Sequence, residues 1–192
     1  MIAGPSGVGK GSVVRRLLSS DPEGLVPSVS VTTRAARPSE VEGRDYSFLS
    51  DEDFDAMIER DALLEWAPIV GHRSGTPRAF VERELAAGRD VLLEIDVKGA
   101  QQVRDRVPGV VLIFLEPPSM QELEARLRGR ETESEDGIRR RLETAAWELT
   151  QRTWFDHVIV NDDLERASSQ VAAIIEASRS DPRSETTEEP FA

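Results

Sequence analysis

The sequence predicts an α/β fold: a three-layer core with a parallel sheet, an inserted lobe of short strands around one helix, and a helical insertion. The core follows from the almost continuous apolar runs "DVLLEID", "GVVLIFLE" and "FDHVIVND", which are typical of buried parallel strands. Between these runs lie segments whose apolar residues recur with helical spacing. Strands and helices that alternate in this way place helices on both faces of a parallel sheet.

The same patterns give the order of the elements along the chain. Strands are expected at residues 26–34, 44–50, 64–70, 90–96, 109–116 and 155–162. Helices are expected at residues 11–20, from 51 to about 62, and at 76–88, 117–130, 138–152 and 163–178. Ser50 caps the second of these helices, and Ser119 with Glu122 forms a capping box at the fourth.

Composition along the chain divides it into one domain and a tail. Residues 28–77 form the inserted lobe, and residues 118–141 are helical and charged, as expected of a lid. The core comprises residues 1–27, 78–117 and 142–177. Residues 178–192 are polar and without periodicity, which predicts a disordered tail. Only three residues precede the first glycine-rich loop, too few for a full central strand, so we expect the natural start to lie upstream.

The composition excludes several classes of protein. The 192 residues suffice for one compact core, and no apolar run approaches the ~20 residues that span a bilayer. No secretory signal is expected, and without cysteine neither a disulfide framework nor a thiolate zinc site can form. A net charge of -12 argues against a nucleic acid polymer as substrate. We therefore expect a cytoplasmic protein without a membrane, nucleic acid or obligatory protein partner.

The stretch "GPSGVGKGS" begins at Gly4 and follows the phosphate-binding pattern G-x-x-x-x-G-K-S/T. Gly9 and Lys10 also fit, but Gly11 stands where the pattern has a hydroxyl, and Ser12 follows it. Backbone N–H groups at a helix start bind anions without any side chain. Lys10 is one of two lysines beside twenty-two arginines, and a compact ammonium fits between phosphates where a planar guanidinium does not. The alternative is an ordinary glycine turn.

Two carboxylates come at the end of the buried strand in "VLLEIDVKG". Glu94 and Asp96 are two residues apart, so they project from one face at the carboxyl end of the strand. Ligands of open α/β sheets bind at such ends. The pair therefore predicts a magnesium ion, held directly or through water, or an acceptor for a base. The alternative is a cap for the following helix.

The charged insertion supplies a cluster of arginines. Arg126 and Arg130 lie four residues apart and share a helix face, and Arg139, Arg140 and Arg141 follow. In an acidic chain with a phosphate loop, such a cluster favours a site that neutralises phosphate charge. The alternative is a solvated helix whose arginines pair with acidic neighbours.

The inserted lobe carries residues suited to a second ligand. Arg34 and Arg37, with Tyr46 nearby, can clamp a phosphate with two guanidinium forks. Glu65 lies in an apolar setting, where a lone carboxylate needs a partner. One carboxylate can accept both N–H donors of a guanine edge, at N1 and the 2-amino group, and adenine lacks that pair. The alternative for Glu65 is a half-exposed strand acid.

Six motifs together resemble those of guanylate kinases, in the same order and spacing, from residue 1 to about 177. They are "GPSGVGKGS", "SVSVTTRAARPSEVEGRDYSF", "LLEWA", "LLEIDVKGA", "RLRGRETESE" and "VIVNDD". The resemblance implies a P-loop nucleoside monophosphate kinase whose core, GMP-binding lobe and lid close around ATP with Mg²⁺ and GMP or dGMP. It implies in-line transfer of the γ-phosphoryl group of ATP, giving ADP and GDP.

The resemblance also implies roles for individual residues. The residues implied in ATP binding are Gly4, Pro5, Ser6, Gly7, Val8, Gly9, Lys10, Gly11, Ser12 and Asn161. Those implied in GMP binding are Ser30, Arg34, Arg37, Tyr46, Glu65, Thr76 and Asp96. Those implied in catalysis are Lys10, Arg126, Arg130 and Arg141. Mg²⁺ would have no direct protein ligand, with Glu94 and Asp96 acting through water, and Asn161 would lie against the ATP base.

One departure from the family pattern concerns the GMP phosphate. In "GHRSGT", Ser74 stands where the family more often has a tyrosine whose hydroxyl reaches that phosphate. We expect Arg73, or Ser74 through water, to supply the missing contact. Two other functions remain open: an interaction domain of guanylate-kinase type that binds a phosphorylated peptide, and a related kinase with another acceptor, such as ribose bisphosphate or a different monophosphate.

Overall fold

The computed structural model describes residues 1–38, 40–69, 71–129 and 134–180. Its core sheet is parallel and has the order β2–β7–β1–β8–β9. Strand pairing joins β2 to β7, and it joins β8 to both β1 and β9. Two backbone hydrogen bonds connect these two parts: the N–H of Ile2 donates to the carbonyl oxygen of Leu93 (2.8 Å), and the N–H of Ile95 donates to that of Ile2 (3.3 Å). The strands are β1 (Ile2–Ala3), β2 (Leu25–Pro27), β7 (Asp90–Leu92), β8 (Ile113–Glu116) and β9 (His157–Val160).

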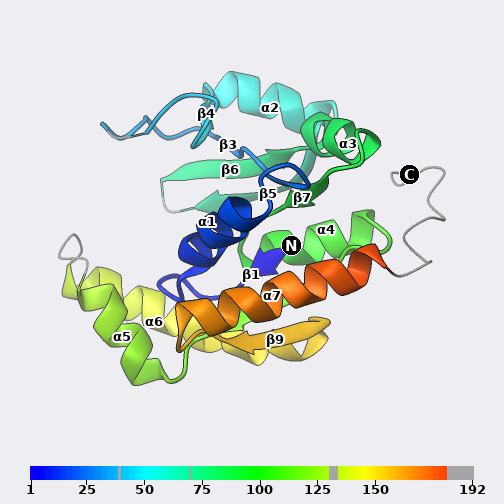
Figure 1. The fold of residues 1–192 in the computed structure, drawn as a ribbon. Coiled ribbons are helices and arrows are strands. Elements are labelled where there is room, and N and C mark those ends of the chain that lie inside the picture. The colour runs from blue at the N-terminus through cyan, green and yellow to red at the C-terminus, as the bar shows by residue number, and fades with distance from the viewer. Residues whose placement is uncertain (39, 70, 130–133, 181–192) are drawn as a thin grey trace.

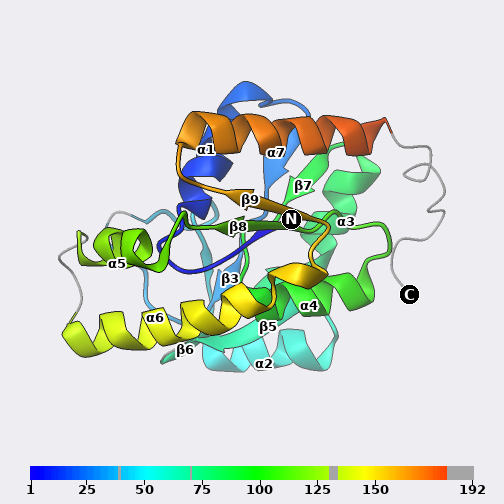
Figure 2. The same cartoon turned by 90° about the horizontal axis from the view of Figure 1, so that it is seen from below.

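Helices cover both faces of this sheet, as Figure 2 shows for β8 and β9. Successive residues of β8 point to opposite faces, so Ile113 packs on one face with α1 and α7, and Phe114 on the other with α3 and α4. These helices are α1 (Lys10–Ser20), α3 (Arg78–Ala86), α4 (Val97–Arg106) and α7 (Leu164–Arg179). The predicted α/β core is confirmed. Within the described residues, no helix has the length and apolarity that crossing a bilayer requires.

The inserted lobe has its own mixed sheet, of order β4–β3–β6–β5, with one helix packed on it (Figure 1). Its elements are β3 (Val31–Thr32), β4 (Ser47–Phe48), α2 (Asp51–Glu59), β5 (Leu63–Ile69) and β6 (His72–Pro77). Phe54 of α2 is fully buried beside Val31 and Leu63. The lobe contacts the core through Gln102 of α4, which exchanges two hydrogen bonds with the backbone of Trp66, at 2.8 and 3.2 Å.

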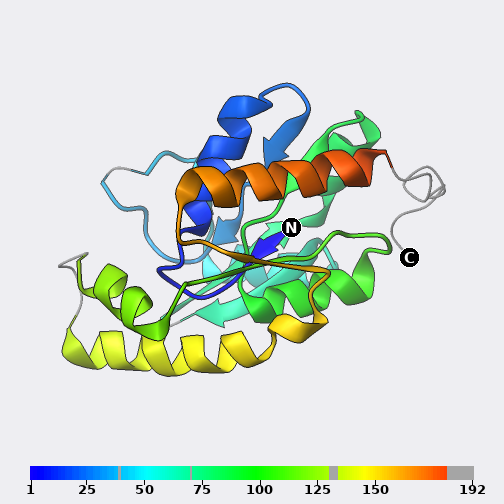
Figure 3. The ribbon, with the colours of Figure 1, turned by 60° about the horizontal axis from the view of Figure 1, so that its bottom comes forward.

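Two helices form an arm beside the core, α5 (Met120–Arg128) and α6 (Glu135–Thr150), and the short η1 (Arg152–Trp154) follows. Each helix is capped by a serine, Ser119 and Ser134, whose hydroxyl accepts a backbone N–H of the first turn. Leu123, Leu127 and Ile138 pack between the two helices. Figure 3 shows the arm and the loop before β4 projecting on the same side of the molecule.

The structure corrects several predicted elements. β9 was expected to be buried, yet Val158 is 43% exposed and only Ile159 is buried, because β9 is the edge strand of the sheet. The predicted strand 26–34 is divided between β2 and β3, which belong to different sheets. Residues 72–77, which were expected to form a loop and the start of a helix, form the strand β6.

The domain boundaries stay predictions, with one correction. The predicted tail began at residue 178, but α7 continues to Arg179. The rest of that tail, from residue 181, and residues 130–133 of the predicted lid lie outside the described residues. The expectation of an upstream start also stays a prediction.

Candidate active site

The loop from Gly4 to Lys10 requires its glycines. Gly4, Gly7 and Gly9 have φ values of 144°, 88° and 100°, a region that other residues rarely adopt. A Cβ atom at Gly4 would lie 2.2 Å from the carbonyl oxygen of Leu115. The loop ends where α1 begins, so its N–H groups and the positive end of the helix dipole face a common space. An ordinary glycine turn does not need this shape.

A cavity of about 250 Å³ lies over this loop. It is lined by Ser6, Gly7, Gly9, Lys10, Gly11, Ser12, Arg15 and Glu94. The Nζ atom of Lys10 donates to the carbonyl oxygens of Gly4 (2.6 Å) and Pro5 (3.2 Å), so the ammonium lies over the loop. The carboxylate oxygens of Glu94 lie 3.5 Å from where a Cβ atom at Gly11 would be, so Glu94 faces the loop across the cavity.

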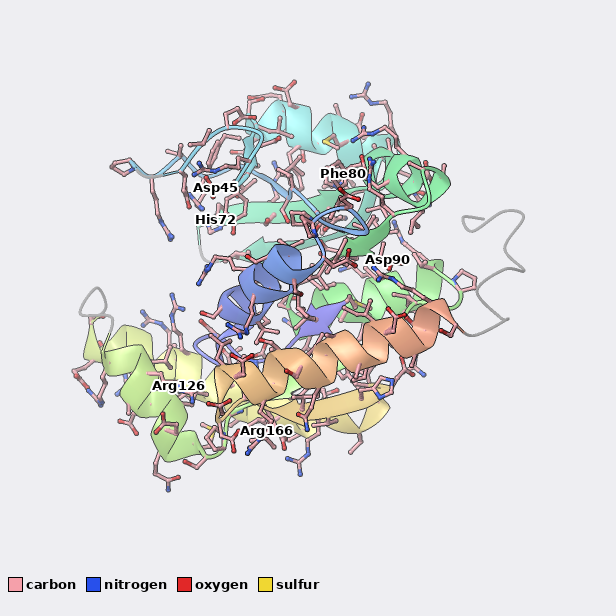
Figure 4. The ribbon with its side chains drawn as sticks, viewed as in Figure 1. Asp45, His72, Phe80, Asp90, Arg126 and Arg166 are labelled. Carbon is pink, nitrogen blue, oxygen red and sulfur yellow. The ribbon has the colours of Figure 1, made fainter. Side chains whose placement is uncertain are left out.

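The helical arm contributes two of the three predicted arginines to the loop. Arg141 donates to the hydroxyl of Ser6 at 2.6 Å. Arg126, labelled in Figure 4, donates to the carbonyl oxygen of Asn161 at 3.1 Å. Arg139 and Arg140 are exposed, because a helix that turns Arg141 toward the loop turns its neighbours away. Arg130 lies outside the described residues.

Asn161 is buried against the loop. Its side-chain amide donates to the carbonyl oxygen of Val8 at 2.7 Å, and a Cβ atom at Gly9 would lie 2.5 Å from that nitrogen. Asn161 therefore fixes the shape of the loop, a contact that its expected place against the ATP base did not anticipate. The contact with the base stays a prediction.

The predicted base-binding residue Glu65 is buried, with 5% of its surface exposed, so the half-exposed alternative is wrong. Thr76 donates its hydroxyl hydrogen to Oε1 of Glu65 at 2.7 Å. Burial, and then the nearby charge of Asp96, raise the pKa of Glu65 to about 7, while the Thr76 hydrogen bond lowers it. A Cβ atom at residue 99 would lie 2.7 Å from Oε2 of Glu65, so a larger residue there would displace the carboxylate.

Glu94 and Asp96 face different places. Asp96 caps α4 by accepting the N–H of Gly99 at 2.7 Å, and its charge acts on Glu65. Glu94 instead faces the phosphate loop. The capping alternative therefore holds for Asp96, and a joint action of Glu94 and Asp96 on magnesium through water stays a prediction. Among the described residues, no three Asp, Glu, His or Cys side chains come together as metal ligands.

The predicted phosphate clamp of the lobe is partly assembled. The guanidinium of Arg34 lies over the ring of Tyr46, 4.7 Å from its centroid, and both Nη atoms bind the carboxylate of Glu40. The side chain of Arg37 is 73% exposed and 3.9 Å from Glu40. Ser30 is half-buried, and its carbonyl oxygen accepts the N–H of Ser47 at 2.9 Å.

Arg73, expected to contact the GMP phosphate, has partners within the lobe. Its side chain forms ion pairs with Asp51 and Asp55 of α2 and lies 4.8 Å from the ring of Phe54. Residues 74 and 76 share the other face of β6, because side chains alternate along a strand. Ser74 is therefore on the same face as Thr76, and its hydroxyl donates to Val31 O at 3.1 Å.

The sequence prediction missed a buried acid on α6. Glu148 is 6% exposed, and burial raises its pKa to about 7, opposed by the charges of Lys10 and Lys98. Its position could have been found from spacing: it lies seven residues after Arg141 and three after the buried Ala145, and so on the same helix face. Glu40 was also missed.

A phosphate loop on an α/β core, faced by arginines and accompanied by a second polar site on an inserted lobe, defines a P-loop protein of the phosphotransferase class. The sequence model of the family described as guanylate kinase matches residues 1–178. The chain therefore belongs to the guanylate kinase family, which uses ATP to phosphorylate GMP.

Individual relatives are similar over most of their length. The guanylate kinase of Nocardia farcinica is 53% identical over 182 residues, which cover 94% of each chain. That of Parasynechococcus marenigrum is 55% identical over 167 residues, 87% of this chain and 91% of the relative. The crystal structure of the guanylate kinase from Anaplasma phagocytophilum superposes with a TM-score of 0.76 at 32% identity, covering 100% of this chain and 94% of that one.

Proposed function

We propose that this chain transfers the γ-phosphoryl group of ATP to GMP and to dGMP, giving ADP and the corresponding diphosphate. The observation that supports the acceptor most is the buried carboxylate of Glu65, held by Thr76 at 2.7 Å. A guanine edge offers two N–H donors that one carboxylate can accept, and an adenine edge does not. Of the other residues proposed for GMP, Arg34, Arg37 and Tyr46 address its phosphate. Ser30, Thr76 and Asp96 address the base and its surroundings, so no residue is assigned to the 2′-hydroxyl and dGMP is expected to bind as well.

The reaction needs no general base. The attacking oxygen belongs to the phosphate of GMP, which is already anionic near pH 7. Catalysis then consists of alignment and of neutralising charge on the transferring group. We assign the neutralisation to Lys10 with Arg126, Arg130 and Arg141, of which Arg141 and Arg126 contact the loop region at Ser6 and Asn161.

Mg²⁺ is proposed to arrive bound to ATP, where it neutralises the β- and γ-phosphates. Glu94 fits a role through water, because its carboxylate lines the same cavity as the loop residues. Asp96 is assigned to the guanine side, beside Glu65. Ser12 is assigned to the α-phosphate region of ATP, as it lines the same cavity.

The two halves of the site are proposed to close on their ligands. The lobe (28–77) carries the GMP residues and the lid (118–141) carries Arg126 and Arg130, so closure would exclude water and bring the two phosphates into line. We place the reaction in the cytoplasm, as a step in guanine nucleotide recycling.

An acceptor panel tests this proposal directly. ADP formation from ATP and Mg²⁺ is measured with GMP, dGMP, AMP, UMP and ribose bisphosphate. We expect comparable kcat/KM for GMP and dGMP and values at least ~10²-fold lower for the others, because a site built to bind a donor pair leaves its own buried groups unpaired with other acceptors. Equal turnover with AMP or with ribose bisphosphate would overturn the assignment of the acceptor, and no turnover with any acceptor would overturn the activity itself.

A further inference from the structure

Glu40 closes the loop that carries the two arginines of the phosphate clamp. Its carboxylate binds Arg34 at both oxygens, from Nη1 at 2.6 Å and from Nη2 at 2.7 Å. It also accepts the backbone N–H of Arg37 at 2.8 Å, and its own N–H donates to Arg37 O at 3.0 Å. The Arg34 and Glu40 side chains are only 16% and 13% exposed, so the pair is shielded from water.

The contacts of Arg34 determine which edge of its guanidinium faces a ligand. A guanidinium has five N–H groups in a planar fork. The carboxylate of Glu40 accepts one N–H of Nη1 and one N–H of Nη2. The carbonyl oxygen of Ala35 accepts the second N–H of Nη1, at 3.0 Å. The two that remain, on Nε and Nη2, point in parallel along the other edge. That edge matches two oxygens of a phosphate.

The charge state of Glu40 keeps this arrangement fixed at working pH. Hydrogen bonds from Arg34, and then from the N–H of Arg37, lower the pKa of Glu40 to about 2. The carboxylate is therefore ionised throughout the neutral range. The ring of Tyr46 packs against the face of the Arg34 guanidinium, with its centroid 4.7 Å from Cζ of Arg34.

We propose that Glu40 is a positioning residue for the acceptor phosphate, which it serves by holding Arg34 with its Nε–Nη2 edge toward that phosphate. The inference rests on the proposed function, in which Arg34 binds the phosphate of GMP. Glu40 itself does not touch GMP. It orients the guanidinium before GMP arrives, so that the cost of ordering a long side chain is met during folding and not during binding.

The test replaces Glu40 by its neutral isostere. In Glu40→Gln, one side of the fork meets an amide NH₂ instead of an oxygen, so we expect the KM for GMP to rise at least ~10-fold while kcat and the KM for ATP change less than about threefold. Glu52→Gln is the matched control, because Glu52 is exposed on α2 of the same lobe. We expect no change there. Thermal unfolding of both variants checks that the lobe stays folded.

A double-mutant cycle asks whether Glu40 acts through Arg34. In the Arg34→Ala background, Glu40→Gln should raise the KM for GMP less than about twofold further. Direct titration of the free enzyme with guanosine, which has no phosphate, should give the same affinity for Glu40→Gln as for the wild type.

The outcomes separate this inference from the proposed function. If Arg34→Ala leaves the KM for GMP unchanged, the proposed phosphate clamp fails. If Arg34→Ala raises it but Glu40→Gln does not, the positioning role alone fails. A lower KM in Glu40→Gln would also overturn that role, because it would mean that the carboxylate competes with the phosphate for Arg34. Equal effects of Glu40→Gln with and without Arg34 would show that it acts elsewhere.

Discussion

The two halves of the site recognise their ligands by different means. The loop between Gly4 and Ser12 is one continuous stretch in which backbone N–H groups and a single ammonium face a cavity. The lobe side is built from side chains of separate elements, with Glu65 from β5, Thr76 from β6 and Asp96 at the start of α4. Phosphate is common to all nucleotides, so a backbone cradle suffices for it, whereas a base must be distinguished by placed side chains.

Both halves hold a buried carboxyl whose pKa is raised. On the lobe side, Glu65 has a pKa raised to about 7 by burial, and the arm adds Glu148 with the same direction and cause. Each carboxyl is costly to ionise until something compensates it. For Glu65, the guanine N–H groups are the proposed compensation. Each half therefore holds one pH-sensitive carboxyl, Glu65 on the acceptor side and Glu148 near Lys10 of the loop.

The largest expected effect removes the side chain of the loop half. Lys10→Met keeps the backbone cradle but loses the ammonium, so kcat should fall by about 10³-fold, the size found when a charge-stabilising group is lost from a transition state, with little change in the KM for GMP. Lys98→Met is the control, since Lys98 is the other lysine and is exposed. A Lys10→Met enzyme within tenfold of the wild type would mean that the backbone alone neutralises the phosphates.

The corresponding change in the lobe half is Gly99→Ala. The added Cβ atom would lie 2.7 Å from Oε2 of Glu65, so the carboxylate must move. Overpacking costs about 1–3 kcal/mol, which corresponds to a rise of roughly 5- to 150-fold in the KM for GMP, with the KM for ATP unchanged. Gln101→Ala, an exposed position on the same helix, is the control. Equal changes in both KM values would contradict the separation of the two halves.

The raised pKa values predict how stability depends on pH. Glu65 and Glu148 titrate near 4.5 when unfolded and near 7 when folded, so the unfolded state loses protons first as the pH rises between these values. Without ligand, each therefore lowers the free energy of unfolding progressively from pH 4.5 to 7, by at most about 3 kcal/mol. The Tm of Glu65→Gln relative to the wild type should increase over that range. The control is Glu143→Gln, at an exposed position of α6, and its Tm should differ from that of the wild type by the same amount at every pH. If the Tm of Glu65→Gln also differed from the wild type by a constant amount, the raised pKa of Glu65 would be contradicted.

The smallest expected effect lies away from both halves. Ser168 on α7 is buried, and its hydroxyl has no hydrogen-bond partner within the described part of the chain. Ser168→Ala should stabilise the fold by about 0.5–1 kcal/mol and leave the kinetics unchanged, because a desolvated hydroxyl is removed. Thermal unfolding, with the exposed Ser169→Ala as control, measures this. A lower Tm for Ser168→Ala would show that the hydroxyl is compensated.

What could be predicted from sequence follows the same division. The loop was predicted correctly because its residues are adjacent, and glycine spacing reports a local backbone shape. The core strands were predicted from apolar runs, but the exposure of β9 was missed, since a run of valines does not reveal an edge position.

The lobe was harder, because its contacts join distant residues. The choice between Arg73 and Ser74 depends on β6 being a strand, which the sequence did not indicate. Strand alternation places Ser74, and not Arg73, on the face of Thr76, so it favours Ser74. Glu40 and Glu148 are common surface residues by type. The spacing of Glu148 from Arg141 was a usable signal that went unused, whereas only the folded chain shows that Glu40 is enclosed beside Arg34.

The central claim, that Glu65 reads the guanine edge, is tested most directly by comparing GMP with inosine monophosphate. The latter lacks only the 2-amino group, so it offers one N–H donor in place of two. In the wild type we predict a kcat/KM at least ~10²-fold higher for GMP, since the inosine base leaves a buried carboxylate oxygen unpaired. In Glu65→Gln that ratio should fall below about tenfold. A ratio that is the same in both enzymes would contradict the account.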